Sequence, residues 1–227
     1  MNNKPLNKYF DQTLLRADAA EAQIQALLAE AAEYDFAAVC VNGCHVRTAA
    51  RALADTDVKV ATVVGFPLGA MSPEAKVQET RIAIADGADE IDMVMNIGAA
   101  KDGRWDVVER EIAALAEVCQ QEDESGRPAL LKVILETCLL TDEEIVAACL
   151  AAQRAGADFV KTSTGFSTGG ATVHAVELMK KTVGETMQVK ASGGIRSLSD
   201  AKAMIAAGAD RLGCSASVDI MKACLQK

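Results

Sequence analysis

The tripeptide Gly-Ala-Asp recurs three times in this chain, and each copy joins an alanine-rich helical pattern to an apolar run. The copies lie at 87–89, 156–158 and 208–210. Glycine commonly ends a helix because it adopts a left-handed backbone, and the apolar residues after it then begin a strand. The repeated joint predicts a strand-helix unit of roughly 26 to 35 residues that recurs along the chain.

Eight short apolar segments are typical of buried strands, and helical patterns lie between them. The predicted strands span 8–14, 36–42, 58–65, 89–96, 130–137, 158–164, 187–193 and 210–215. The predicted helices span 20–34, 46–54, 73–86, 105–122, 142–155, 172–183, 198–207 and 216–225. Apolar strands that alternate with helices form parallel sheets covered on both faces. Eight repeats in 227 residues predict an α/β fold, a closed (β/α)8 TIM barrel rather than an open sheet, as a single domain over residues 1–227.

The charge balance argues against several kinds of partner. The formal net charge is -9 and no basic run is present, so we expect no nucleic-acid surface. No stretch of ~18 uncharged apolar residues exists, so we expect no membrane span. Seven cysteines and the lack of an apolar leading segment predict a cytoplasmic protein without a disulfide framework. The polar stretch 122–128 predicts a surface loop rather than a linker.

Cys40, Cys44 and His45 form a cluster that could hold a metal ion. A zinc site of this kind needs a second cluster to complete four ligands, and none occurs at the usual spacing. We therefore predict no metal site.

Two lysines end short apolar runs, where a solvated lysine is not expected. Lys161 follows Asp-Phe-Val, and Lys190 follows Gln-Val. Taking an ammonium group out of water is costly, and the group tends to give up its proton instead. An amine kept neutral by burial and by a second cation attacks carbonyl groups. The pattern indicates imine chemistry, and the spacing leaves open which lysine is the nucleophile.

Four consecutive predicted strands each carry a charge within an apolar run, and the first strand adds one more. The residues are Asp92, Lys132, Lys161, Lys190 and Asp11. Reactive groups of barrels lie at the carboxyl ends of strands ~4.8 Å apart, so these side chains can converge on one pocket, where the carboxylate can remove and return protons. The alternative is a set of plain ion pairs. Four adjacent strands argue against it, because burying several charges is unfavourable unless they are used.

Glycines and hydroxyl groups follow the last predicted strands, where barrels usually bind phosphate. Backbone amides at such a position bind an anion well. A loop beside Lys161 adds further hydroxyls and amides, although its composition also fits an ordinary flexible loop. The candidate substrate- and phosphate-binding residues are Thr164, Gly165, Gly193, Gly194, Gly213 and Ser215.

The segments around these residues resemble the deoxyribose-phosphate aldolase family, class I aldolases with a barrel fold. The similarity runs nearly end to end and is most specific at 159–170 and 189–196. Further similar segments lie at 11–15, 38–42, 64–69, 87–94 and 131–137.

The resemblance implies that Lys161 forms the imine and that Asp92 and Lys190 donate and accept protons. It also implies that Lys132 and Asp11 tune the charge around them. The reaction implied is reversible cleavage of 2-deoxy-D-ribose 5-phosphate to D-glyceraldehyde 3-phosphate and acetaldehyde.

The same resemblance implies a substrate pocket that includes Cys40, no metal or organic cofactor, and a homodimer or higher homo-oligomer. One position departs from the family pattern on the phosphate side. Ala216 follows Ser215 where the family often has a second serine, so one hydroxyl group is missing.

Two other functions remain open at this point. One is another Schiff-base lyase or transaldolase acting on a different phosphorylated sugar, which a panel of aldehyde acceptors would separate from the first. The other is a barrel that binds a sugar phosphate without catalysis. That function would leave the two lysines replaced or unpaired, whereas Lys161 and Lys190 are both present together with Asp92.

Overall fold

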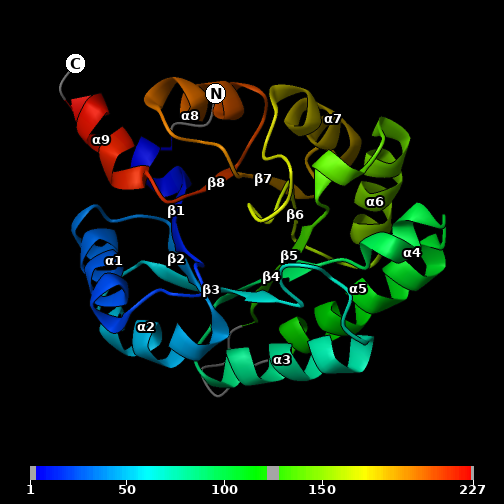
Figure 1. The fold of residues 1–227 in the computed structure, drawn as a ribbon, viewed down its shortest axis with the longest axis horizontal. Helices are drawn as coiled ribbons and strands as arrows, with labels where there is room; N and C mark the ends of the chain where they lie inside the picture. Colours follow the sequence, from blue (N-terminus) through cyan, green and yellow to red (C-terminus); the bar gives the residue numbers. More distant parts are fainter. Residues whose placement is uncertain (1–3, 122–127, 226–227) are drawn as a thin grey trace.

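The strands of this chain form a closed barrel in which all neighbours are parallel and follow one another in sequence order (Figure 1). The computed structural model describes residues 4–121 and 128–225. The strands are β1 (Phe10–Leu14), β2 (Ala38–Val41), β3 (Lys59–Val64), β4 (Glu90–Val94), β5 (Leu130–Ile134), β6 (Phe159–Lys161), β7 (Gln188–Ser192) and β8 (Arg211–Cys214). The predicted (β/α)8 barrel is therefore confirmed.

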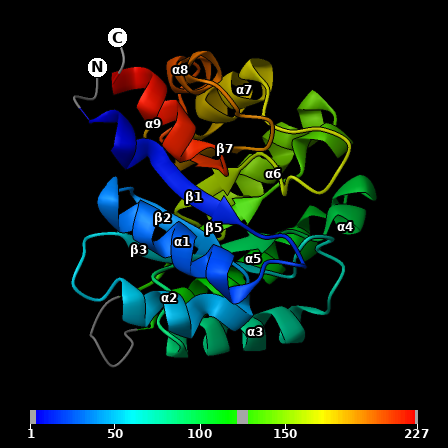
Figure 2. The same ribbon diagram turned by 60° about the vertical axis from the view of Figure 1, so that its left-hand side comes forward.

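Helices surround the barrel, and Figure 2 shows from the side how α1 and α9 cover β1. The α-helices are α1 (Glu21–Glu33), α2 (Val46–Ala52), α3 (Pro73–Ala85), α4 (Ile97–Lys101), α5 (Trp105–Gln120), α6 (Asp142–Arg154), α7 (Val173–Val183), α8 (Leu198–Ala206) and α9 (Ser217–Leu225). Short 3-10 helices are η1 (Leu6–Tyr9), η2 (Gly43–His45) and η3 (Thr137–Leu139).

The elements differ from the prediction mainly at their ends. The predicted first strand began at residue 8, but Lys8 and Tyr9 belong to η1. The short helix α4 was not predicted, because five residues carry too little periodicity to be recognised. The predicted loop at 122–128 lies outside the described residues except for Pro128. Along the described chain no helix is both long and apolar enough to cross a membrane, and the seven cysteines are free.

The three Gly-Ala-Asp copies precede β4, β6 and β8, and each copy forms hydrogen bonds to the neighbouring strand β3, β5 or β7. Each glycine has a positive φ, between 83° and 106°, as expected where a helix ends. Each aspartate donates its amide to a carbonyl on the preceding strand, and its carboxylate accepts the amide of that same strand residue. The pairs are Asp89 with Val60, Asp158 with Leu131 and Asp210 with Val189, at 2.8 to 3.0 Å. Each aspartate therefore forms a reciprocal pair of hydrogen bonds, which we call the clamp, between two neighbouring strands at the amino-terminal end of the barrel.

Removing one of these carboxylates should weaken the barrel measurably. In Asp89→Ala the Val60 amide loses its charged acceptor, and we expect the free energy of unfolding in urea to fall by about 1–3 kcal/mol. Asp55→Ala, at an exposed turn position, is the control and should leave stability unchanged. Equal stabilities of the two variants would show that the clamp contributes nothing.

Candidate active site

Seven charged side chains, nearly all fully buried, fill the inside of the barrel, and we call them the charged cluster. They are Asp11 on β1, Glu90 and Asp92 on β4, Lys132 on β5, Lys161 on β6, Lys190 on β7 and Arg211 on β8. All five charged residues predicted from the sequence are among them. The parallel register explains the convergence, because Asp92 pairs with Lys132 across β4 and β5, and Lys161 pairs with Lys190 across β6 and β7.

The carboxylate of Asp92 lies at the centre of the charged cluster and accepts hydrogen bonds from three ammonium groups. Lys132 donates to Oδ1 at 2.7 Å. Lys161 and Lys190 donate to the other oxygen, Oδ2, at 2.7 and 2.8 Å. One carboxylate thus holds lysines from three different strands within a few ångströms of one another.

Two further members of the charged cluster, Glu90 and Arg211, were not predicted. Arg211 donates to Asp11 at 2.7 Å from Nε and to the two oxygens of Glu90 at 3.2 and 3.0 Å. Glu90 also contacts Lys132 at 2.6 Å, and Asp11 contacts Lys190. The sequence did carry a signal for both residues, since each is a charge directly after a Gly-Ala-Asp copy and at the start of an apolar run.

The balance between burial and charge fixes the protonation states inside the barrel. Burial alone would raise the pKa of Asp92, but the three ammonium groups around it hold that pKa well below its usual range. Burial alone would lower the pKa of Lys190, but the carboxylates of Asp11 and Asp92 outweigh it and raise the pKa. The pKa of Lys132 is also raised, because its two carboxylate partners outweigh burial. Lys190 and Lys132 therefore stay protonated at neutral pH.

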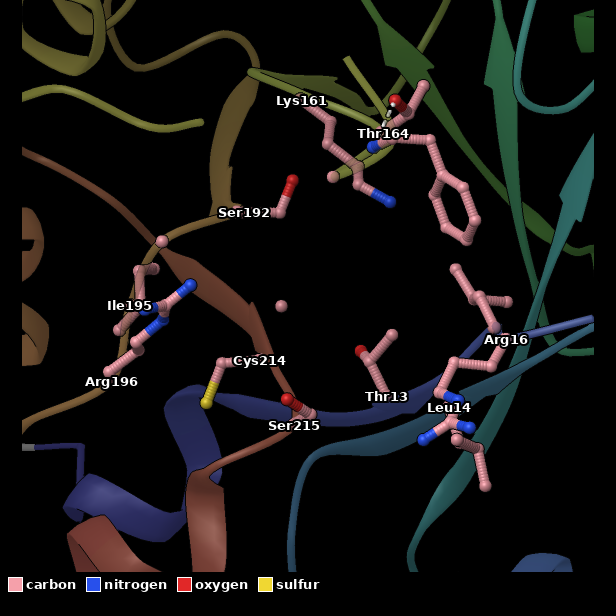
Figure 3. A pocket seen from close by; sticks show the side chains of 16 residues that line it. Thr13, Leu14, Arg16, Lys161, Thr164, Ser192, Ile195, Arg196, Cys214 and Ser215 are labelled. Atoms are coloured by element: carbon pink, nitrogen blue, oxygen red, sulfur yellow. Dashed lines mark hydrogen bonds between the residues drawn. The ribbon is translucent and has the colours of Figure 1, made fainter. Parts of the chain in front are cut away.

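A cavity of about 440 Å³ opens above the charged cluster at the carboxyl ends of the strands (Figure 3). Of the seven cluster residues, all within the described chain, only Lys161 lines it, and its amino group points into the open space. The cavity wall also includes six residues predicted to bind substrate or phosphate. These are Thr164, Gly165, Gly193, Gly194, Gly213 and Ser215.

The hydroxyl group of Thr164 already forms two hydrogen bonds within the protein. It donates its proton to Glu136 at 2.5 Å and accepts the Phe166 amide at 3.0 Å. Glu136 is buried and has a left-handed backbone with a φ of 58°, which is unusual for a residue other than glycine. Since a hydroxyl has one proton to donate, Thr164 can accept a hydrogen bond from a ligand but cannot donate one to a phosphate.

Gly213 and Gly194 serve different purposes at the cavity. A Cβ atom at Gly213 would lie 3.1 Å from Cε of Lys190, so this glycine leaves room for the lysine side chain. Gly194 has a φ of 83°, and a Cβ atom there would meet nothing within 4 Å. The positive φ therefore explains the glycine, which is also part of the cavity wall.

Two arginines that the sequence analysis did not single out also line the cavity, on opposite sides of it (Figure 3). Arg16 is neutralised by Asp18, to which it donates from Nε at 2.8 Å and from Nη2 at 2.6 Å. Arg196 is exposed and takes part in none of the salt bridges among the described residues, and its backbone amide and, to a lesser degree, its charge lower the pKa of the nearby Asp200. Arg196 is therefore the cation at the cavity rim that remains available to an anionic ligand.

Cys40 does not line this cavity, contrary to the expectation from sequence. Its side chain is fully buried and packs with Ala61, Val63 and Leu15 below the opening. Burial raises the pKa of the Cys40 thiol, and the charge of Asp92 adds to the effect. In the part of the chain that the structure describes, no group of three or more histidine, cysteine or acidic residues is placed to hold a metal ion.

Nearly the whole chain matches the sequence model of one protein family. Residues 6–223 match the model of the DeoC/LacD family aldolases. The chain belongs to this family. Among its relatives, a deoxyribose-phosphate aldolase from Streptococcus gordonii is 59% identical over 217 residues, which is 96% of each chain. One from Lactococcus lactis is 57% identical over the same share.

Solved structures of the family agree with the fold. The tetrameric deoxyribose phosphate aldolase of Aeropyrum pernix is 33% identical and superposes with a TM-score of 0.88, covering 97% of this chain and 91% of its own. The similarity to family members thus extends over the barrel and the strands that carry the charged cluster.

Removing one cation from the interior tests whether the charged cluster is balanced as described. Arg211→Met leaves two buried carboxylates short of a partner, and we expect the free energy of unfolding to fall by about 3 kcal/mol or more. Lys8→Met breaks the more exposed ion pair with Asp35 and is the control, expected to cost less than about 1 kcal/mol. Denaturant unfolding of both variants at neutral pH measures the difference, and a loss at Arg211 no larger than at Lys8 would contradict the prediction.

Proposed function

We propose that this protein is a class I aldolase that reversibly cleaves 2-deoxy-D-ribose 5-phosphate to D-glyceraldehyde 3-phosphate and acetaldehyde through a Schiff base on Lys161. Relatives that are 57–59% identical over nearly the whole chain are deoxyribose-phosphate aldolases. The observation that carries the mechanism is the position of the Lys161 amino group, which lies at the cavity and at a buried carboxylate at the same time.

The charged cluster favours Lys161 over Lys190 as the nucleophile. Fully ionised, it holds four cations and three carboxylates, so one proton is in excess. Lys190 contacts two carboxylates, whereas Lys161 contacts only Asp92 through an oxygen that it shares with Lys190. Loss of the Lys161 proton balances the charges and leaves each remaining cation with two carboxylate partners. A neutral amine that faces the cavity is the nucleophile that imine formation requires.

The reaction then follows from the chemistry of the imine. The Lys161 amine adds to the aldehyde carbon of the open-chain sugar, and loss of water gives a protonated imine. A base takes the proton of the C3 hydroxyl, the bond between C2 and C3 breaks, and its electrons move to the imine to form an enamine. Glyceraldehyde 3-phosphate leaves, C2 of the enamine takes up a proton, and water releases acetaldehyde and the free amine.

Asp92 and Lys190 are the groups we assign to these proton transfers. Asp92 touches the Lys161 nitrogen at 2.7 Å, and Lys190 bonds to the same carboxylate oxygen at 2.8 Å, so a proton can pass along this line. Lys132 contacts Asp92, and Asp11 contacts Lys190, rather than Lys161 itself, so we assign these two residues the role of holding Asp92 and Lys190 charged.

The cavity also favours one orientation of the substrate. Arg196, the amides after β7 and Ser215 suit the phosphate group, because they supply positive charge and donors. The buried carboxylate of Glu136 repels an anion, and Thr164 beside it suits a donating hydroxyl group. We therefore place the phosphate near Arg196 and the carbon chain between it and Lys161.

Assembly and location follow from relatives and composition. We propose a homodimer or higher homo-oligomer, since the Aeropyrum pernix relative is tetrameric. The seven unpaired cysteines in the described chain fit the proposed cytoplasmic location, where thiols stay reduced.

Covalent trapping tests the proposed nucleophile. Treatment with acetaldehyde and borohydride should add a stable two-carbon group to Lys161, because reduction fixes the imine as a secondary amine. Intact mass measurement and peptide mapping locate the group. Lys161→Ala should lose both the label and the aldolase activity, whereas Lys101→Ala, at a surface lysine, should keep both. Labelling of Lys190 in place of Lys161 would overturn the assignment.

Truncation of Arg196 tests the proposed phosphate end. In Arg196→Leu we expect KM for 2-deoxyribose 5-phosphate to rise about tenfold, because one charged contact to the phosphate is lost. The kcat/KM for unphosphorylated 2-deoxyribose should stay the same. Arg16→Leu is the matched control with a smaller effect, since Asp18 already neutralises that guanidinium. An equal loss on both sugars would place the phosphate elsewhere.

A further inference from the structure

A second buried ion pair lies outside the barrel interior and takes no part in the proposed chemistry. Lys76 on α3 and Glu111 on α5 meet at 2.7 Å with side chains that are 0% and 1% exposed. No member of the charged cluster is among the hydrogen-bond partners of either residue in the described chain.

The ion pair forms hydrogen bonds to the backbone of the segment that follows Asp92. The Lys76 ammonium uses all three of its donors, to Glu111, to the Val94 carbonyl and to the Gly69 carbonyl, at 2.7 to 2.8 Å. The other oxygen of Glu111 accepts the Asn96 amide at 2.9 Å. Val94 ends β4, only two residues after Asp92, so the pair holds the last carbonyl of the strand and an amide two residues beyond it.

The loop before α3 is shaped around this lysine. Gly65 and Gly69 both have positive φ, at 62° and 67°. A Cβ atom at Gly65 would come within 2.7 Å of Cε of Lys76, and one at Gly69 within 2.0 Å of the Met95 carbonyl oxygen. Two glycines therefore let the lysine pass and let the loop press against the end of β4.

Stability alone is a poor explanation for this pair. Lys76 lies in the first turn of α3, where the helix dipole disfavours a cation. Burial lowers the pKa of Lys76 and raises the pKa of Glu111, although each partner's charge opposes the change. Buried ion pairs of this kind are often no better for stability than apolar side chains of similar size.

We propose that Lys76 and Glu111 are positioning residues that fix the carboxyl end of β4 and thereby hold Asp92 in line with Lys161 and Lys190. The inference rests on the proposed function, because Asp92 is the proton-transferring group only if the aldolase mechanism holds. A displacement of Asp92 changes the distances to two lysine nitrogens at once, since both contact its Oδ2 atom. Small misplacements of a reacting group lower rates steeply.

The double variant Lys76→Met/Glu111→Leu removes both charges and leaves neither partner stranded. We expect a folded protein by circular dichroism whose kcat falls about 10- to 100-fold while KM changes less than about threefold. Uptake of deuterium from heavy water at the methyl carbon of acetaldehyde should slow in parallel, since it reports proton transfer at the enamine. Borohydride labelling of Lys161 by acetaldehyde should still reach completion.

The milder variant Glu111→Gln keeps the volume of the side chain and an oxygen for the Asn96 amide. The loss of the carboxylate lowers stability, because the buried Lys76 loses its anion. Burial already lowers the pKa of Lys76, so the lysine can give up its proton and the variant can fold. We expect kcat lowered by about tenfold and KM unchanged. Arg154→Met is the matched control, because it breaks an ion pair between α6 and α5 that is much more exposed than that of Lys76 and Glu111. Its kcat should equal that of the unchanged protein.

The outcomes separate the two proposals. Unchanged kcat in folded Glu111→Gln, or a rise in KM alone, would overturn the positioning role and leave the aldolase function standing. Failure of acetaldehyde to label Lys161 in the unchanged protein would instead refute the Schiff-base function, and the positioning role would fall with it. Parallel losses of kcat and deuterium uptake with full labelling would establish the role.

Discussion

The interior of this barrel depends on a single carboxylate, that of Asp92. An isolated buried charge costs several kcal/mol, so the charged lysines around Asp92 need carboxylates beside them to stay inside the barrel. Asp92 can serve three lysines because β4, β5, β6 and β7 close around it in an unbroken parallel register. Closure of the barrel between β8 and β1 adds Asp11 to this arrangement, where it contacts Lys190 and Arg211, so part of the charge compensation depends on closure.

The same charge compensation accounts for the role proposed for Lys161, which lies among other charges rather than alone. Lys132 and Lys190 each have two carboxylate partners, which hold them charged. Their positive charges in turn act on the Lys161 amine, which has only a share of Asp92. In the proposed mechanism, the reactivity of Lys161 is thus a property of the whole charged cluster, because the cluster holds one cation more than its carboxylates can balance.

Much of this site could be predicted from sequence because the relevant signals are local. A charge such as Asp92 or Lys132 within an apolar run cannot reach water from a buried strand, and consecutive strands of a barrel are neighbours. The pattern therefore indicated which side chains meet. It could not indicate which oxygen each lysine takes, because strand register is set by the closed barrel. Glu90 and Arg211 escaped notice since a charge next to a turn is usually solvated.

Lys76 and Glu111 show where sequence reasoning fails for a different reason. Charged residues on amphipathic helices normally face water, and the first turn of α3 gives no local sign that Lys76 points inward. On the preceding loop, Gly65 leaves room for Lys76, and Gly69 allows the loop to approach the Met95 carbonyl closely. Only the packed structure joins these positions to the end of β4. Charges that act through the backbone of a neighbouring strand are therefore the part of such a site that an isolated sequence conceals.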